Sequence, residues 1–130
     1  MTKEDKELLL RDICPRLLCG VKVKVPHLQD DIVFTLCGID KDIYIVTKDN
    51  GSKFYIPTII DVFPYLRPMY SMTNEERAER IGLLWEFEGN INEDVTYKYQ
   101  DWLNAHHLDY RGLIPMGLAI EVTEKNNPYK

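Results

Sequence analysis

One stretch of the chain decides the fold: VKVKVPHLQDDIVFTLCGIDKDIYIVTKDNGSKFYIPTIIDV, residues 21–62. Apolar and polar residues alternate within its runs, and this period of two is typical of strands with one buried face. Turn residues separate the runs, and Asp49, Asn50 and Gly51 together form a strong hairpin signal. The stretch therefore predicts a small antiparallel sheet that supplies most of the core.

Four short strands are expected within this stretch. They cover residues 21–25, 32–39, 43–47 and 53–56, and residues 65–70 are either a closing strand or an extended crossing. Polar residues 29–31 are expected to form a loop, and Gly38 marks a bulge in the second strand. Short strands joined by tight turns are typical of an SH3-like barrel or of a bent antiparallel sheet of four to five strands. Both architectures fit the pattern.

A helix that begins at Lys3 is predicted before the sheet. Thr2 and Asp5 have the spacing of a capping box, and apolar residues then recur at helical spacing. Pro15 has no amide hydrogen and disfavours helical geometry at Cys14, so the helix should end or kink there. We expect its apolar side to lie on the sheet.

A second capping box, formed by Thr73 and Glu76, predicts another helix that runs to about Glu88. An apolar stripe follows it at helical spacing: Ala78, Ile81, Leu84 and Trp85. Because large aromatic residues at this spacing usually pack inward, we expect Trp85 in the core. Gly82 costs about 1 kcal/mol relative to Ala inside a helix, so we expect a close packing contact there.

Asn92 is expected to cap a third helix, which carries Val95, Tyr99, Trp102 and His106 on one face. Residues 108–117 are predicted to form a structured loop, and the tail from residue 124 is expected to fray. The predicted class is α+β, with an N-terminal helix, a small barrel or bent sheet, and two C-terminal helices. The single domain, residues 1–130, divides into the first helix (1–18), the β-rich core (21–72), the helical pair (73–108) and the C-terminal loop and tail (109–130).

Composition narrows the class of protein. With 45% hydrophobic and 28% charged residues, the chain has the balance of an ordinary globular domain. Its net charge of −5 lacks the basic excess that binds phosphate backbones, which disfavours nucleic acid as a partner. The charged start and the lack of a run of about 20 apolar residues favour a cytoplasmic protein with no membrane partner. The three cysteines, Cys14, Cys19 and Cys37, lack CxxC spacing and are expected to be buried, reduced thiols.

The richest group of chemically active side chains lies in DWLNAHHLDYRGLIPMG, residues 101–117. The candidate binding residues within it are Trp102, His106, His107, Asp109, Tyr110 and Arg111. Adjacent histidines on a helix point about 100° apart, so they cannot chelate one ion as an i, i+4 pair would. One interpretation is structural, with these side chains satisfying the helix end and pairing with one another. The other is a partner-binding surface at residues 110–116, because Tyr, Arg and Met are enriched at interfaces.

Other kinds of site have weaker support. The sequence contains no recognisable nucleophile motif and no phosphate-binding loop, so we assign no catalytic residue, no metal and no cofactor. A face of four lysines with two tyrosines could bind nucleic acid, although a solvated outer face also explains it: Lys22, Lys24, Lys48 and Lys53, with Tyr44 and Tyr55. An aromatic groove for Pro-rich peptides would use Tyr55, Tyr65, Tyr70 and Trp85, but we expect most of these rings in the core.

Four segments of the chain resemble one family. These are KEDKELLLRDIC (residues 3–14), the DNG hairpin, DVFPYLRPMYSMT (residues 61–73) and DWLNAHHLDYRGLIPMGLA (residues 101–119). Together they resemble an uncharacterised family of small proteins encoded in genomes and prophages of Bacteroides-type gut anaerobes, over nearly the whole chain. Members of that family tend to have Pro-Tyr where this chain has Leu18 and Cys19, which leaves the end of the first helix open. The resemblance implies a soluble accessory, regulatory or structural role that is phage-related, and it implies no activity.

We therefore expect a non-enzymatic cytoplasmic protein that acts by binding another macromolecule, alone or as a homo-oligomer. Protein is the expected partner because the net charge is negative. Two alternatives stay open. One is a metal-dependent or hydrolytic enzyme that uses His106, His107 and Asp109, and the other is a nucleic-acid-binding protein that uses the lysine face.

Overall fold

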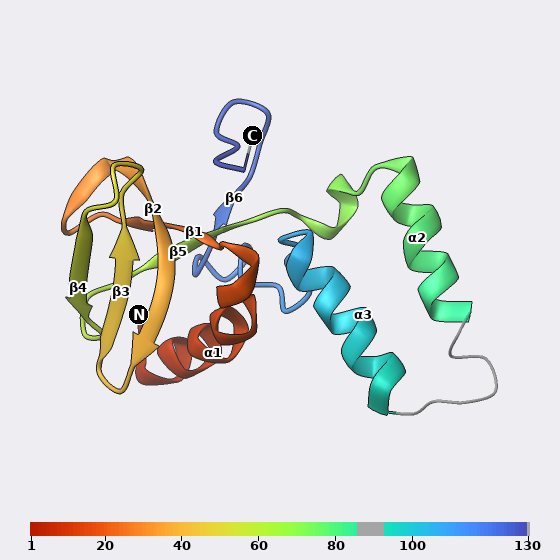
Figure 1. The fold of residues 1–130 in the computed structure, drawn as a ribbon, viewed down its shortest axis with the longest axis horizontal. Coiled ribbons are helices and arrows are strands. Elements are labelled where there is room, and N and C mark those ends of the chain that lie inside the picture. Colours follow the sequence, from red (N-terminus) through yellow and green to blue (C-terminus); the bar gives the residue numbers. More distant parts are fainter. Residues whose placement is uncertain (86–92, 130) are drawn as a thin grey trace.

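The computed structural model describes residues 1–85 and 93–129, in which a sheet is flanked by helices (Figure 1). The strands are β1 (Lys22–Val25), β2 (Gln29–Asp40), β3 (Ile43–Thr47), β4 (Lys53–Pro57), β5 (Phe63–Leu66) and β6 (Ile120–Glu121). The helices are α1 (Lys3–Ile13), α2 (Asn74–Trp85) and α3 (Glu93–Ala105), with 3-10 segments η1 (Cys14–Cys19) and η2 (Met69–Ser71). The predicted α+β class is confirmed.

The described strands form one open sheet in the order β4-β3-β2-β1-β5-β6. Neighbours from β4 to β5 are antiparallel, whereas β6 runs parallel to β5. Within the described residues β4 and β6 have a strand on one side only, so the strand pairs do not close into an SH3-like barrel. The long β2 lies between β1 and β3.

One face of the sheet forms the core. Val21, Val23 and Val25 are fully buried, while the lysines between them are half-buried, which confirms the predicted alternation. Leu9 and Ile13 of α1 pack against this face and are also buried. α1 begins and ends as predicted, since the capping box between Thr2 and Asp5 is present and the chain passes into η1 before Pro15.

Two local expectations about β2 are tested by the register. The predicted loop at residues 29–31 is wrong, because Leu28 donates to the Val25 carbonyl in a tight turn and Gln29 already pairs with Val25. The bulge is confirmed, since the register with β3 shifts between Leu36 and Gly38.

The expected burial of the thiols is wrong. Cys14 and Cys37 are exposed, and Cys19 is half-buried; all three are free. Cys14 and Cys19 lie at the two ends of η1, where the chain turns away from the core. Cys37 lies in the β2 bulge, and its thiol reaches the Ile45 carbonyl at 3.3 Å.

The C-terminal segment is anchored, contrary to the expectation that it frays. The Tyr129 hydroxyl donates to the Tyr65 carbonyl at 2.7 Å and accepts the Lys22 amide hydrogen at 3.0 Å. Together with the pairing of β6 on β5, these bonds tie the segment to the middle of the sheet. The Tyr129 hydroxyl therefore both donates and accepts a hydrogen bond, and so it holds the segment in place. The polar composition of the tail does not indicate this anchor.

The two C-terminal helices extend away from the sheet. α3 lies between α2 and the rest of the molecule, and α2 forms the outer edge (Figure 1). The predicted end of the second helix at Glu88 and the predicted cap at Asn92 lie outside the described residues. The arrangement leaves α2 with α3 as its main packing partner.

Candidate functional site

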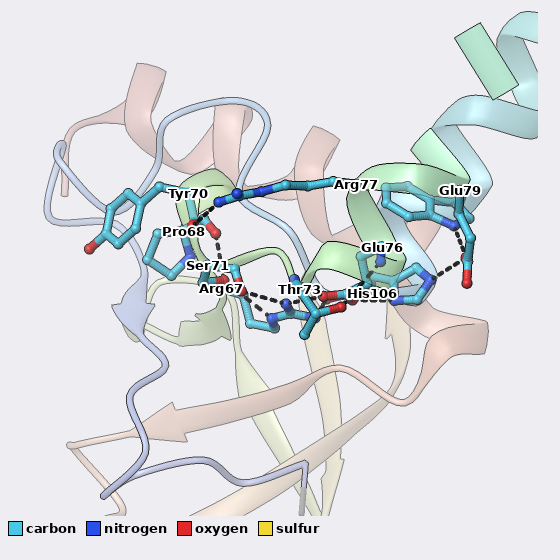
Figure 2. A network of polar contacts seen from close by, with 10 residues as sticks. Arg67, Pro68, Tyr70, Ser71, Thr73, Glu76, Arg77, Glu79 and His106 are labelled. Atoms are coloured by element: carbon cyan, nitrogen blue, oxygen red, sulfur yellow. Dashed lines mark hydrogen bonds and ion pairs between the residues drawn. The ribbon is translucent and has the colours of Figure 1, made fainter. Parts of the chain in front are cut away.

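Arg67 follows β5 and joins the sheet to both C-terminal helices (Figure 2). Its Nη1 and Nη2 donate to the two carboxylate oxygens of Glu76 at 2.8 and 2.7 Å, and its Nε donates to Ser71 Oγ at 3.3 Å. Its amide donates to the His107 carbonyl at 2.7 Å, and its own carbonyl accepts the Asp109 amide hydrogen at 2.8 Å. One residue therefore fixes where α2 begins and where α3 ends.

Glu76 is the other half of this attachment. The predicted capping box is present: Glu76 Oε1 accepts the Thr73 amide hydrogen at 2.8 Å, and the Glu76 amide donates to Thr73 Oγ1 at 3.1 Å. His106 Nδ1 lies 2.8 Å from Glu76 Oε2. The hydrogen bonds from Arg67 lower the pKa of Glu76 to about 2, so this carboxyl is ionised at neutral pH.

The contacts continue along the side of α2 that faces α3. Trp102 Nε1 donates to Glu79 Oε2 at 2.9 Å, and the Trp102 and His106 rings lie 4.5 Å apart. Arg80, the next residue of α2, donates from Nε to the hydroxyl of Tyr99, which lies about one turn before Trp102 on α3, at 2.6 Å. We call Arg67, Glu76, Glu79, Trp102 and His106 the polar bridge. Through it, α2 turns its polar side toward the protein.

The opposite side of α2 is exposed and mostly apolar. This outer face consists of Arg77, Ala78, Ile81, Gly82, Leu84 and Trp85. The exposed fractions are 72% for Trp85, 51% for Ile81 and 37% for Leu84. A Cβ placed on Gly82 would meet no atom within 4 Å. The expectations of a buried Trp85 and of a close contact at Gly82 are therefore wrong, because Glu76 is bound on the opposite side of the helix.

α2 is thus an amphipathic helix whose polar side faces the protein and whose apolar side faces solvent. A surface helix normally packs its apolar stripe on the core and leaves its polar side in water. In α2, Glu76 is the buried residue, whereas Ile81 and Trp85 are open to solvent. Contiguous exposed apolar surface on a folded domain marks an interaction site more often than isolated apolar residues do. The outer face is therefore the candidate functional site.

The histidine pair has a structural arrangement. α3 ends in a Schellman motif, in which the Leu108 amide donates to the Leu103 carbonyl at 3.1 Å and the His107 amide to the Asn104 carbonyl at 3.0 Å. His107 takes the left-handed conformation that this motif needs, with φ of 58°. Its ring stacks on Tyr129 at 3.7 Å. Burial, aided by the charges of nearby cations, lowers the pKa of His107 to about 4.

The remaining predicted site residues follow the end of α3. Asp109 accepts the amide hydrogens of Leu113 and Ile114 at 2.8 and 2.9 Å and so closes the loop. Two guanidinium groups lie over the Tyr110 ring, with the Arg16 Cζ 5.0 Å and the Arg111 Cζ 5.5 Å from its centroid. The six candidate residues do not converge on one point.

No metal centre or membrane helix is found in the part of the chain that the structure describes. Residues 1–85 and 93–129 contain no cluster of three or more His, Cys, Asp or Glu side chains that could hold an ion. None of the helices there is long and apolar enough to cross a membrane.

An open pocket of about 880 Å³ lies beside the polar bridge, with Tyr70, His106, His107 and Tyr129 among its lining residues.

The lysine face is only partly assembled. Lys22, Thr35, Thr47 and Lys53 stand in one row across four strands, as the register requires. Lys22 Nζ donates to Thr35 Oγ1 at 2.7 Å, and Lys48 lies over the Phe54 ring. Tyr44 is 2% exposed and belongs to the core instead. The proposed aromatic groove is likewise divided, because Tyr65 is buried while Tyr55 and Tyr70 are exposed on separate elements.

Comparison with protein-family models, curated proteins and solved structures finds no match to this chain. The resemblance to a family of Bacteroides-type genomes and prophages stays a prediction.

Sequence reasoning missed two features of the site. It assigned no role to Arg67, a single basic residue between β5 and a proline, and it placed the outer face of α2 in the core. A signal for the second was present, since Glu76, Glu79 and Arg80 lie opposite the apolar stripe at helical spacing. Whether the polar or the apolar side faces inward depends on partners outside the helix, here Arg67 and Trp102.

Proposed function

We propose that this protein is a non-enzymatic protein-binding module and that the outer face of α2 is its contact surface. The observation that carries the proposal is the reversed polarity of α2. Ile81, Leu84 and Trp85 are exposed side by side. On the opposite side of the same helix, Glu76 is bound to Arg67 and Glu79 to Trp102.

The polar bridge supports this proposal because it gives the surface a fixed orientation. Arg67 and Glu76 form a two-pronged ion pair, which is geometrically more specific than a single contact. The capping box with Thr73 fixes the first turn of the same helix. A helix held in this way loses little conformational freedom when a partner binds, which favours affinity.

The chemistry of the outer face favours a protein partner. Its only charged residue is Arg77, so it lacks the repeated cations that bind phosphate backbones or anionic lipid surfaces. The net charge of −5 acts against both partners as well. Tryptophan is enriched among the residues that dominate protein-protein binding energy, and the Trp85 side chain on this surface is 72% exposed.

The segment of residues 110–116 is a weaker choice of contact surface. The Tyr110 hydroxyl donates to Asn104 Oδ1 at 2.8 Å, and Leu113 is fully buried. Arg111 Nε lies 3.6 Å from a carboxylate oxygen of Asp12. Tyr110→Ala or Arg111→Ala would therefore disturb packing as well as a surface, whereas Ile81 and Trp85 of the outer face are 51% and 72% exposed.

The test is a selection of binding peptides from a random display library on the immobilised full chain. The double variant Ile81→Gln, Trp85→Gln removes the apolar surface and keeps good helix propensity. The matched control is Tyr55→Gln, Ile59→Gln, since these residues are 64% and 80% exposed on the other part of the molecule. Circular dichroism checks that all three proteins are folded.

Selected peptides should be rich in apolar and aromatic residues. Calorimetry with a synthetic peptide should show affinity at least tenfold weaker for the α2 variant and unchanged for the control, because a lost apolar contact of about 1.4 kcal/mol is a tenfold change. Equal binding to the α2 variant, or no enrichment on the native chain, overturns the proposal. Vesicle binding that the α2 variant abolishes would also overturn it, in favour of a lipid surface.

A further inference from the structure

We infer that the occupant of the outer face of α2 is the same face of a second copy, packed as an antiparallel helix pair. This inference rests on the proposed function and names its partner. The resulting dimer would be isologous, with each residue contact occurring twice across a two-fold axis.

The distribution of large and small residues on the outer face supports self-pairing. Ala78 and Trp85 lie seven residues, or about two turns, apart on the same side of the helix. In an antiparallel pair with its two-fold axis beside Ile81, Trp85 of one copy meets Ala78 of the other. The small side chain makes room for the indole, as a ridge enters a groove in helix packing.

The centre of the pair is apolar in both copies. Ile81 lies next to the axis, so the two Ile81 side chains contact each other. Leu84 comes opposite the hydrocarbon stem of Arg77 from the other copy, and long cationic side chains commonly cover apolar surface in this way. The open space around Gly82 adds no atom that would hold the helices apart.

Charge selects the antiparallel orientation over the parallel one. A parallel pair would set Arg77 against Arg77 and Trp85 against Trp85. In the antiparallel pair the two Arg77 positions are separated by about nine residues, or about 13 Å along the helix axis. Antiparallel helices also place the positive end of each helix dipole beside the negative end of the other.

The first experiment is sedimentation equilibrium of the full chain under reducing conditions, because Cys14 and Cys37 are exposed. A concentration range from about 1 µM to about 500 µM covers dissociation constants typical of small interfaces. The 15.3 kDa chain should approach twice its mass as concentration rises. Ile81→Glu and Ile81→Lys should each raise the dissociation constant at least tenfold, because each places two like charges beside the axis.

An equimolar mixture of the two charged variants is the decisive sample. If Ile81 faces itself across the axis, the mixture should regain a dissociation constant within about threefold of the native value, because opposite charges now meet. The control pair, Ile59→Glu and Ile59→Lys, lies outside α2 and should leave the native dimerisation unchanged. Mixtures that stay monomeric overturn the inference.

Orientation is tested by oxidative cross-linking in the background Cys14→Ser, Cys19→Ser, Cys37→Ser. Ile81→Cys should cross-link efficiently to its own copy, whereas Ala78→Cys should not, since the two copies of position 78 lie about 10 Å apart along the axis. Efficient cross-linking at 78 would indicate a parallel pair and overturn the antiparallel geometry.

The outcomes separate this inference from the proposed function. A chain that stays monomeric over the whole concentration range, yet binds selected peptides through Ile81 and Trp85, overturns the second copy as occupant and keeps the binding module. A dimer that survives both charged variants at Ile81 overturns the inference too, because it must form through another surface.

Discussion

The guanidinium of Arg16 forms two hydrogen bonds with the carboxylate of Asp12, at 3.0 and 3.1 Å, and neither side chain is exposed. The same guanidinium donates to the Leu108 carbonyl at 2.7 Å, so a buried ion pair at the end of α1 holds the segment that follows α3. Burial raises the pKa of Asp12, and Arg16 opposes this by favouring the charged form. The Arg16 guanidinium thus links the N-terminal part of the domain to the C-terminal part.

Removing that cation should be costly. Arg16→Met leaves the Asp12 carboxyl buried without its partner, and we expect a loss of about 3–5 kcal/mol in the free energy of unfolding. Arg11→Met, at an exposed position of α1, is the control and should change stability by less than about 0.5 kcal/mol. Urea denaturation measures both. A loss below about 1 kcal/mol for Arg16→Met would show that the pair contributes little.

Glu76→Gln tests the attachment of α2. The substitution removes the charge that Arg67 binds, and we expect a loss of about 2–3 kcal/mol at pH 7. Because the folded pKa of about 2 is below the ordinary 4.5, the carboxylate stabilises the fold fully above about pH 4.5, and this contribution is lost as the pH falls toward 2. The difference between native chain and variant should therefore shrink in acid. Glu75→Gln, exposed in the same helical turn, is the control and should change stability at pH 7 by less than about 0.5 kcal/mol.

His107 should make the fold sensitive to mild acid. Its folded pKa of about 4 is below the ordinary 6.5, so between these values the unfolded chain binds more protons. Stability is fully present above about pH 6.5 and falls as the pH drops toward 4. His107→Asn keeps a residue that tolerates the left-handed conformation and removes the titration. Its stability should vary less with pH over this window, and equal slopes for both proteins would contradict the assignment.

Tyr129→Phe tests the anchor of the C-terminal segment. The variant leaves the Lys22 amide and the Tyr65 carbonyl without the hydroxyl that they share, and we expect a loss of about 1–3 kcal/mol. Tyr97→Phe, at a tyrosine that is 59% exposed, should be neutral. Thermal and urea unfolding give the comparison, and equal stability of the two variants would rule out the anchor.

Gly82→Ala should stabilise the chain by about 1 kcal/mol, because the position is helical and a Cβ there would meet nothing within 4 Å. The contrasting variant is Gly51→Ala in the hairpin, where φ is 87° and alanine is strained. It should destabilise the chain. The two melting temperatures should move in opposite directions, and a loss of stability in Gly82→Ala would mean that the helix has a neighbour there.

Local signals in the sequence predicted the elements well. The alternation of Val21, Val23 and Val25, the turn at Gly51 and the capping box of Thr2 depend on neighbours a few residues away, and the structure confirms each of them. The bulge before Gly38 belongs to the same group. Backbone geometry and short-range hydrogen bonds depend on neighbouring residues, so they can be predicted from the sequence.

What could not be predicted depends on partners outside the element concerned. The inward side of α2 is decided by Arg67, which binds Glu76 from outside the helix, so periodicity alone gives the stripe and not its direction. The anchoring of Tyr129 depends on Lys22, at a separation of 107 positions. Such contacts leave no periodic trace in a single sequence.

The anchor at Tyr129 also constrains the order of folding. Its bond to Lys22 and the bond from Arg16 to the Leu108 carbonyl join residues 107 and 92 positions apart. The hairpins from β1 to β4 close only short loops. These two contacts close loops of most of the chain, so the loss of conformational entropy on forming them is larger. The sheet from β1 to β4 should therefore form early, and the C-terminal segment from β6 to Tyr129, here called the C-terminal strap, should dock on it later. During that interval the free edge of β5 is open to pairing with other chains, so slow docking of the strap is the step at which this protein is most exposed to misassembly.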